Sequence, residues 1–167
     1  MKRLSCDVAV IGAGTAGLVA RSAAERAGAR TILIEAGPAG TTCARVGCMP
    51  SKLLIAAAEA AQTARTAKRF GVEAGTVRVD PRAVMARLQA ERGHFVASVL
   101  QSLRKIPPEG CLHGRARFLE RDRLAVEEHS EVQARAIVIA TGARAFIPPP
   151  FRGLGERLLT NDTLFDL

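Results

Sequence analysis

The sequence contains neither tryptophan nor tyrosine, and phenylalanine occurs only six times in 167 residues. It therefore lacks the aromatic set on which proteins stack the bases of single-stranded nucleic acids. The formal net charge is +8, but the 24 lysine and arginine side chains are scattered and form no basic run. We interpret them as solvated surface charges and predict that the protein binds no nucleic acid.

Long hydrophobic runs are also absent, since no segment approaches the roughly twenty apolar residues of a membrane span. We therefore expect a soluble, cytoplasmic protein with no membrane partner. Four cysteines are too few for the framework of a secreted disulfide-rich protein, and no metal-ligand spacing accompanies them, so we expect no metal site. With 48% hydrophobic residues, the chain is long enough for one domain with a real core and too short for two ordinary ones.

A nucleotide-binding signature lies near the beginning of the sequence. Residues 7–11 form an apolar run typical of a buried parallel strand, 18–26 read as a helix, and 30–34 read as a second strand that closes on Glu35. The acidic residue has about the twenty-residue offset of a dinucleotide-binding βαβ unit, where it can bond a ribose hydroxyl. The glycines of the G-x-G-x-x-G between them are Gly12, Gly14 and Gly17.

Each of these glycines has a physical reason to be there. The first two permit a tight turn and the close approach of a pyrophosphate, and the third lets the helix meet the strand. Because the strand, helix, second strand and carboxylate fall in register, the pattern favours nucleotide binding. The alternative is a tight glycine turn without a ligand.

Two cysteines, Cys43 and Cys48, lie five positions apart at the start of an alanine-rich helix. In a regular helix five residues rise about 7.5 Å, whereas disulfide Cα atoms lie about 4.4–6.8 Å apart. If the two pair, the backbone must leave regular helix, and Gly47 is well placed for that. Pro50 fits the first helical turn, so Cys48 lies near a helix N-terminus, where a thiolate is stabilised. The alternative is a pair of buried, unpaired cysteines.

The rest of the chain alternates between long helices and short strands. We predict helices over 51–70, ended by Gly71, and from Pro81 to about 104, with Asp80 as N-cap. Short alternating segments then predict an antiparallel meander, and an apolar run predicts a buried strand before Thr141 and Gly142. Those small residues either let a ligand approach the strand end or simply form a turn. The segments of the meander are 111–118, 123–126 and 132–134, and the apolar run is 135–140.

Three side chains outside these motifs could suggest further chemistry. We interpret His94 as a surface or packing residue. Cys111 and His113 share one face of a strand, but nothing else joins them, so both are interpreted as structural.

The segment 40–52, which ends in Pro50-Ser51-Lys52, resembles the disulfide motif of the class I pyridine nucleotide-disulfide oxidoreductases. This family includes dihydrolipoamide dehydrogenase, mercuric reductase and glutathione reductase, and the ending is more similar to the first two. The resemblance implies an α/β fold: a Rossmann-like FAD-binding domain with a parallel sheet, long helices and an antiparallel β-meander, over residues 1–147. Residues 148–167, which begin with three prolines, would be a linker toward an absent NAD(P)H-binding domain.

The resemblance also implies roles for single residues. Cys48 would be the charge-transfer thiolate that faces the flavin, Cys43 the interchange thiol that meets the substrate, and Lys52 a neighbour of the reactive flavin nitrogen. Two positions depart from the family pattern: Thr41 replaces a usual glycine and Arg45 a usual asparagine. The implied FAD contacts are Gly12, Gly14, Thr15, Ala16, Gly17, Glu35, Ala36, Thr42, Lys52, Ala116, Thr141, Gly142 and Ala143.

The activity implied is that of an FAD-dependent disulfide oxidoreductase similar to dihydrolipoamide dehydrogenase. Electrons would pass between NAD(P)H, the flavin and the Cys43–Cys48 disulfide, and the substrate would be a small disulfide or dithiol such as a lipoyl group. The chain resembles an N-terminal part of a homodimeric enzyme, inactive by itself, whose His–Glu acid–base pair comes from the partner subunit. None of the histidines here, His94, His113 and His129, matches that base. The alternatives are a mercuric or glutathione-type reductase parent and a non-catalytic flavin-binding fragment.

Overall fold

The computed structural model describes all residues, 1–167, and divides into two compact units. The first unit comprises Met1–Thr41 and Ala97–Arg144, and the second comprises Thr42–Val96 and Ala145–Leu167. The division falls inside the longest helix, α4 (Pro81–Arg104). None of the helices combines the length and the hydropathy that a membrane span requires.

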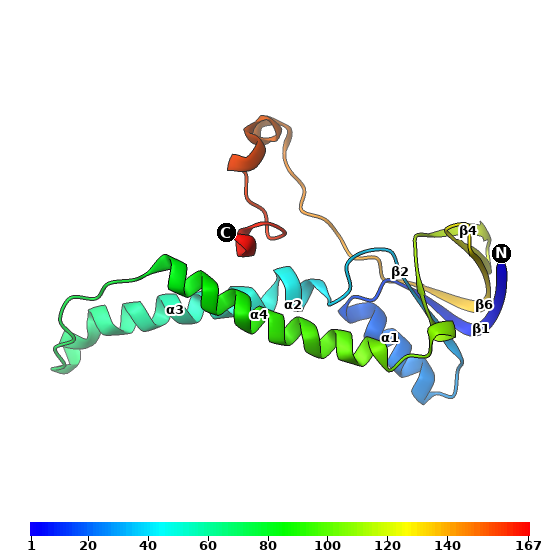
Figure 1. Ribbon diagram of the computed structural model, residues 1–167, viewed down its shortest axis with the longest axis horizontal. Helices are drawn as coiled ribbons and strands as arrows, with labels where there is room; N and C mark the ends of the chain where they lie inside the picture. Colours follow the sequence, from blue (N-terminus) through cyan, green and yellow to red (C-terminus); the bar gives the residue numbers. More distant parts are fainter. The chain divides into compact units, whose positions relative to one another are not determined.

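The first unit is built on one mixed sheet of six strands in the order β3-β2-β1-β6-β5-β4 (Figure 1). The first four in this order are parallel, while β4, β5 and β6 form an antiparallel portion that shares β6. This arrangement confirms the expected α/β fold with a parallel sheet and a β-meander. The strands are β1 (Lys2–Ile11), β2 (Thr31–Glu35), β3 (Cys111–His113), β4 (Ala116–Glu120), β5 (Arg123–Val126) and β6 (Ser130–Ile139).

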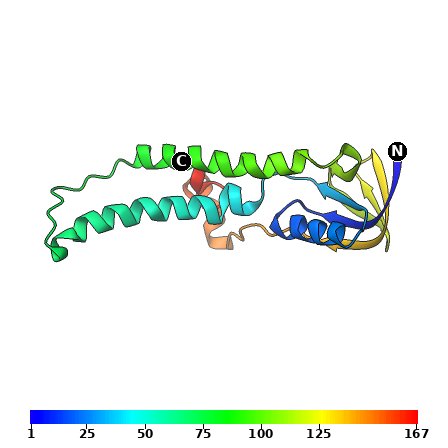
Figure 2. The ribbon, with the colours of Figure 1, turned by 90° about the horizontal axis from the view of Figure 1, so that it is seen from below.

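Apolar clusters lie on both faces of β1 and β2, which explains their nearly continuous hydrophobic sequences. On one face Val10 and Leu33 pack with Leu18 of α1 (Thr15–Arg26) and with Ile106, after the end of α4. Figure 2 shows α1 alongside these strands. The other face holds a larger cluster that includes Ile34 of β2 and Leu124 of β5, although two strands lie between β2 and β5 in the sheet. The cluster therefore extends across the sheet from β2 to β5.

Two strand predictions were wrong. Residues 111–118 are not one strand of the meander, because Gly114 (φ +142°) separates β3 from β4 and β3 pairs in parallel with β2. Residues 132–134 and 135–140 are not separate strands either, since both belong to β6. The second half of β6 is also less buried than its apolar sequence suggests, because Ile139 is 66% exposed. Alternation and apolar content correctly predicted that these segments form strands, but did not predict where the strands end or which strands they pair with.

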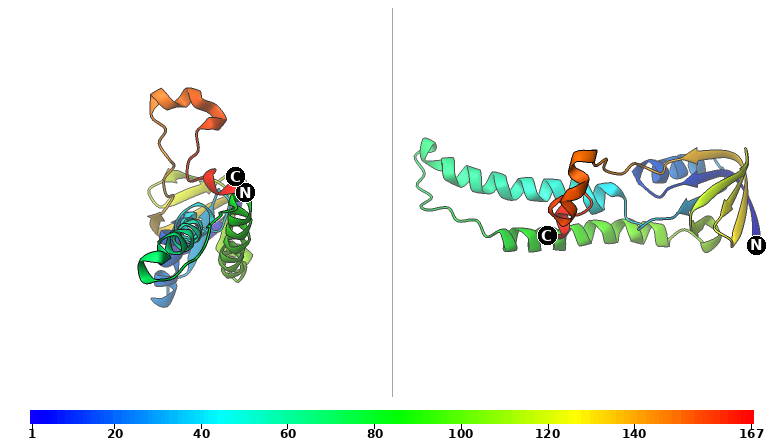
Figure 3. Two further views of the ribbon diagram at one scale, coloured as in Figure 1. Left: turned by 90° about the vertical axis from the view of Figure 1, so that its left-hand side faces the viewer. Right: turned by 90° about the horizontal axis from the view of Figure 1, so that it is seen from above.

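The second unit is helical. The cysteine segment forms α2 (Thr42–Val46) and α3 (Cys48–Thr66), and the short η1 turn (Ala67–Phe70) ends at Gly71 in the left-handed conformation. Asp80 caps α4 as predicted, with Oδ1 accepting the backbone N–H groups of residues 82 and 83 at 2.9 and 3.2 Å. Residues 149–157 form the η3 turns and 164–166 the η4 turn. The core of this unit is a small cluster of Val46, Leu88 and Phe165. In Figure 3, α3 and the first part of α4 run alongside each other.

Candidate functional site

The glycine turn between β1 and α1 is shaped by two close backbone contacts. Gly12 has φ +107°, and a Cβ there would lie 2.3 Å from the carbonyl oxygen of Ala140, at the end of β6. A Cβ on Gly17 would lie 1.8 Å from the carbonyl oxygen of Gly12. A side chain fits at neither position, so these two glycines let the turn, the helix and the neighbouring strand end approach one another.

Gly14 is different, because a Cβ there would meet nothing within 4 Å. Gly14 also precedes α1, whose first turn has no side-chain cap and no acidic residue. A helix N-terminus with free N–H groups and open space beside it suits a phosphate group. Thr15 and Ala16, the first two residues of the helix, are both exposed here. The residues present therefore fit the diphosphate of a dinucleotide such as FAD.

Glu35 at the end of β2 is held against this turn by backbone groups. Its Oε2 accepts the N–H of Ala13 at 2.6 Å, and its Oε1 accepts the N–H of Gly37 at 2.7 Å. A carboxylate has about four acceptor positions, so the fixed carboxylate retains capacity for ribose hydroxyls. The neighbouring Ala36 is exposed.

The remaining predicted FAD contacts of the first unit lie on two other elements. Thr141, Gly142 and Ala143 follow β6 and are exposed, and the backbone N of Thr141 would lie 3.2 Å from a Cβ on Gly12. This strand end therefore adjoins the glycine turn. Ala116 lies at the start of β4, half-buried against the larger core cluster. No feature of the sequence marks Ala13 and Gly37 as partners of Glu35, because contacts made by backbone N–H groups do not depend on residue type.

The second unit brings Cys43 and Cys48 together at the corner between α2 and α3. The backbone leaves regular helix at Gly47 (φ −133°, ψ −119°), as the spacing of the cysteines required. A Cβ on Gly47 would lie 2.9 Å from the carbonyl oxygen of Thr42, so the corner is too tight for a side chain. The two sulfur atoms are present as thiols joined by a hydrogen bond. Cys48 is the first residue of α3 and is exposed, as is Lys52 one turn later.

The environment of Cys43 differs from that expected. The hydrogen bond with Cys48 raises the pKa of Cys43, partial burial and charge interaction with Cys48 act in the same direction, and the backbone N–H groups of Cys48 and Met49 oppose them. The sequence predicts that the free N–H groups of this helix stabilise Cys48, whereas two of them bond Cys43. The net result is that Cys43 retains its proton to higher pH than an ordinary thiol does.

The other cysteines and histidines take structural positions. Burial raises the pKa of Cys6 and of Cys111, which keeps both thiols protonated and unreactive. His113 and His129 bond backbone oxygens, Nδ1 of the first to Glu35 O at 3.1 Å and Nε2 of the second to His113 O at 3.0 Å. His94 is exposed and lies 3.8 Å from Glu91. No three metal-ligating side chains come together anywhere in residues 1–167.

Comparison with known proteins places these features in a family. The sequence model of the pyridine nucleotide-disulphide oxidoreductase family matches residues 6–166. The chain belongs to this family. Its members are FAD-dependent disulfide oxidoreductases that also bind NAD(P)H.

Several family members are about equally similar to the chain. Dihydrolipoyl dehydrogenase from Bacillus subtilis is 33% identical over 93% of this chain, and mercuric reductase from Streptomyces lividans is 34% identical over 96%. Glutathione reductase from Burkholderia cepacia is 34% identical over the whole chain. The chain spans only 35–36% of the length of these three relatives.

Solved structures share the fold of this chain. The Cu(II) complex of RclA, an HOCl-induced flavoprotein disulfide reductase from Escherichia coli, has a TM-score of 0.68 and 25% sequence identity over 87% of this chain and 30% of its own. A mutant form of RclA, at 24% identity, has a TM-score of 0.72 over 98% of this chain and 35% of its own and so shows the shared fold.

Proposed function

We propose that this family member carries the FAD-binding and redox-dithiol parts of a disulfide oxidoreductase similar to dihydrolipoamide dehydrogenase. The observation that carries the proposal is the pair of thiols, Cys43 and Cys48, in hydrogen-bond contact across a corner that admits only glycine. The glycine turn and Glu35 supply a second, independent feature that suits a dinucleotide.

Each part of the first unit has a role in this proposal. The N-terminus of α1 and the open space at Gly14 would hold the diphosphate of FAD, Glu35 would bond a ribose hydroxyl, and the segments at Ala116 and 141–143 would contact the remainder. Bound FAD would supply two-electron transfer between NAD(P)H and the cysteine pair. Lys52 and Thr42 stay predicted contacts, and NAD(P)H binding is assigned to no residue of this chain.

The cysteine pair would exchange electrons with the substrate by thiol–disulfide exchange. The Cys43 thiolate attacks one sulfur of a disulfide, which forms a mixed disulfide and releases one thiolate. The Cys48 thiolate then attacks the Cys43 sulfur, which forms the intramolecular disulfide and releases the second thiolate. The substrate gains two electrons and the cysteine pair loses two, and the reverse sequence oxidises a dithiol. The raised pKa of Cys43 means that its attack needs a base, for which we expect the His–Glu pair implied by the family resemblance.

A non-catalytic flavin-binding module with inert cysteines is the alternative, and thiol mapping on the purified chain separates the two. In a variant whose Cys6 and Cys111 are replaced by alanine, we expect air-oxidised protein to react with a thiol reagent only after reduction. Full labelling of both remaining cysteines before reduction would exclude the redox role. Flavin binding is tested separately, by adding FAD and measuring the protein-bound absorbance and its bleaching with dithionite.

The substrate class needs a direct comparison, because dihydrolipoyl dehydrogenase, mercuric reductase and glutathione reductase are similarly related to the chain. Oxidised chain is mixed with dihydrolipoamide or with reduced glutathione, and the thiols released on Cys43 and Cys48 are counted over time. Faster reduction by dihydrolipoamide is the expected result, and preference for glutathione would favour a glutathione-type parent. If the oxidised chain reacts equally with dihydrolipoamide and glutathione, the protein would next be tested for mercuric reductase activity. The cytoplasmic location, the homodimeric state, the inactivity of the isolated chain and the domain division at residue 147 stay predictions.

A further inference from the structure

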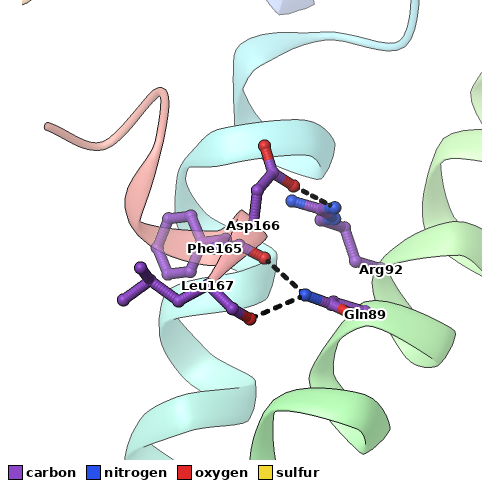
Figure 4. Close-up of polar contacts among 5 residues, drawn as sticks. All are labelled: Gln89, Arg92, Phe165, Asp166 and Leu167. Carbon is purple, nitrogen blue, oxygen red and sulfur yellow. Dashed lines mark hydrogen bonds and ion pairs between the residues drawn. The ribbon is translucent and has the colours of Figure 1, made fainter. Parts of the chain in front are cut away.

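The segment 160–167 packs against α2, α3 and α4. Figure 4 shows polar contacts between its last three residues and Gln89 and Arg92 of α4. Phe165 is only 3% exposed and shares a core cluster with Val46 of α2 and Leu88 of α4. Leu53 and Leu54 of α3 pack against the same cluster. One aromatic ring therefore lies in the only core that joins α2, α3 and α4.

Polar contacts hold this segment at both of its ends. Arg92 pairs with Asp166 at 2.6 Å, and Nε2 of Gln89 donates to the backbone oxygens of Phe165 and Leu167 at 3.4 and 3.1 Å. At the other end, Nδ2 of Asn161 donates to the carbonyl oxygen of Val46 at 3.5 Å. That carbonyl belongs to the last residue of α2, where a helix leaves carbonyl groups without partners.

Val46 lies between the two cysteines in sequence and directly before the corner at Gly47. Thiols five residues apart meet only while α2 and α3 stay bent at that residue, because a continuous helix would separate them. Nothing in the short α2, which has five residues, would fix its angle without tertiary contacts. The contacts of Val46 with the 160–167 segment are therefore positioned to fix the geometry of the cysteine pair.

We propose that Phe165 is a positioning residue for the Cys43–Cys48 pair, which it serves by anchoring the 160–167 segment against Val46 at the α2–α3 corner. The inference rests on the proposed redox function and adds a residue that the cysteine motif does not contain. In this role the segment raises the effective concentration of one thiol at the other, and so favours the disulfide over the dithiol.

The test is the equilibrium between this disulfide and glutathione, measured on the full chain with Cys6 and Cys111 replaced by alanine. In Phe165→Ala we expect the equilibrium constant for disulfide formation to fall about tenfold, which corresponds to about 30 mV for a two-electron couple. The matched control is Phe151→Ala, which removes an aromatic ring that is 50% exposed in the same unit and should leave the constant unchanged. If Phe165→Ala does not fold, Phe165→Leu and Asn161→Ala replace it, with smaller decreases in the same direction.

The outcomes separate this inference from the function on which it rests. An unchanged or increased equilibrium constant in the Phe165 and Asn161 variants would overturn the positioning role, even if their melting temperatures fall, because a merely structural residue would change stability alone. If the parent chain forms no Cys43–Cys48 disulfide at any glutathione ratio, the proposed redox function and this inference both fail.

Discussion

Thr41 precedes the cysteine helix with φ +59°, in the left-handed region that a β-branched residue rarely adopts. For an L-residue this conformation costs about 1–2 kcal/mol. Glycine avoids that cost but loses about 0.5–1 kcal/mol through the greater freedom of the unfolded chain. We therefore expect Thr41→Gly to be more stable than Thr41→Ala by about 1 kcal/mol, the reverse of the usual order of these two residues.

The comparison with alanine is essential, because both variants lose the threonine side chain and any interaction it makes. Urea denaturation would show the difference as a midpoint about 0.5 M higher for the glycine variant, at a slope of about 2 kcal/mol/M. Thr42, the next residue, lies in α2 and supplies the matched control. There the alanine variant should be the more stable one by about 0.5–1 kcal/mol. If Thr41→Ala equals or exceeds Thr41→Gly in stability, the left-handed conformation is not a source of strain.

Three further predictions test other parts of the structure. Gly17→Ala should lose about 3 kcal/mol of stability through overpacking. Gly14→Ala should lose almost no stability but should bind FAD more weakly. Equal melting temperatures for the two variants would contradict the contacts described for these glycines. Gly47→Ala should slow formation of the Cys43–Cys48 disulfide by oxidised glutathione about tenfold, and an unchanged rate would show that the corner tolerates a side chain. The N–H of Arg30 bonds the carboxylate of Asp7 and lowers the pKa of Asp7, and nearby arginine charges add to this effect. The ionised carboxylate therefore stabilises the fold at pH values above the unfolded-state pKa near 3.8. This stabilisation is lost as the pH falls through the lower folded-state pKa. Asp7→Asn should therefore be less stable than the parent at neutral pH and converge with it in acid, as followed by urea denaturation, and a constant difference across the pH range would refute this.

The sequence was sufficient to predict those structural features that depend on one residue and its close neighbours in the chain. The cap at Asp80, the helix stop at Gly71 and the departure from helix at Gly47 each depend on one residue and its neighbours. The first two were predicted outright, and the third was predicted on the condition that Cys43 and Cys48 pair. The pairing of β3 with β2 was not, since an alternating segment has the same pattern in either orientation and its partner lies far away in the chain. The contact of Phe165 with the cysteine corner has no local signal either, because a single phenylalanine in a polar segment does not reveal which core it enters.

The place of β6 in the sheet has a consequence for biosynthesis. β6 pairs with β1 along almost its whole length, with Ser130 opposite Lys2 and Ile139 opposite Ile11. β1 therefore leaves the ribosome long before its partner β6 exists, and β1 keeps one open edge until residues 130–139 are made. Exposed edges of this kind invite pairing with other chains. Nascent chains interrupted before β6 should therefore depend on chaperones more than chains that include β6.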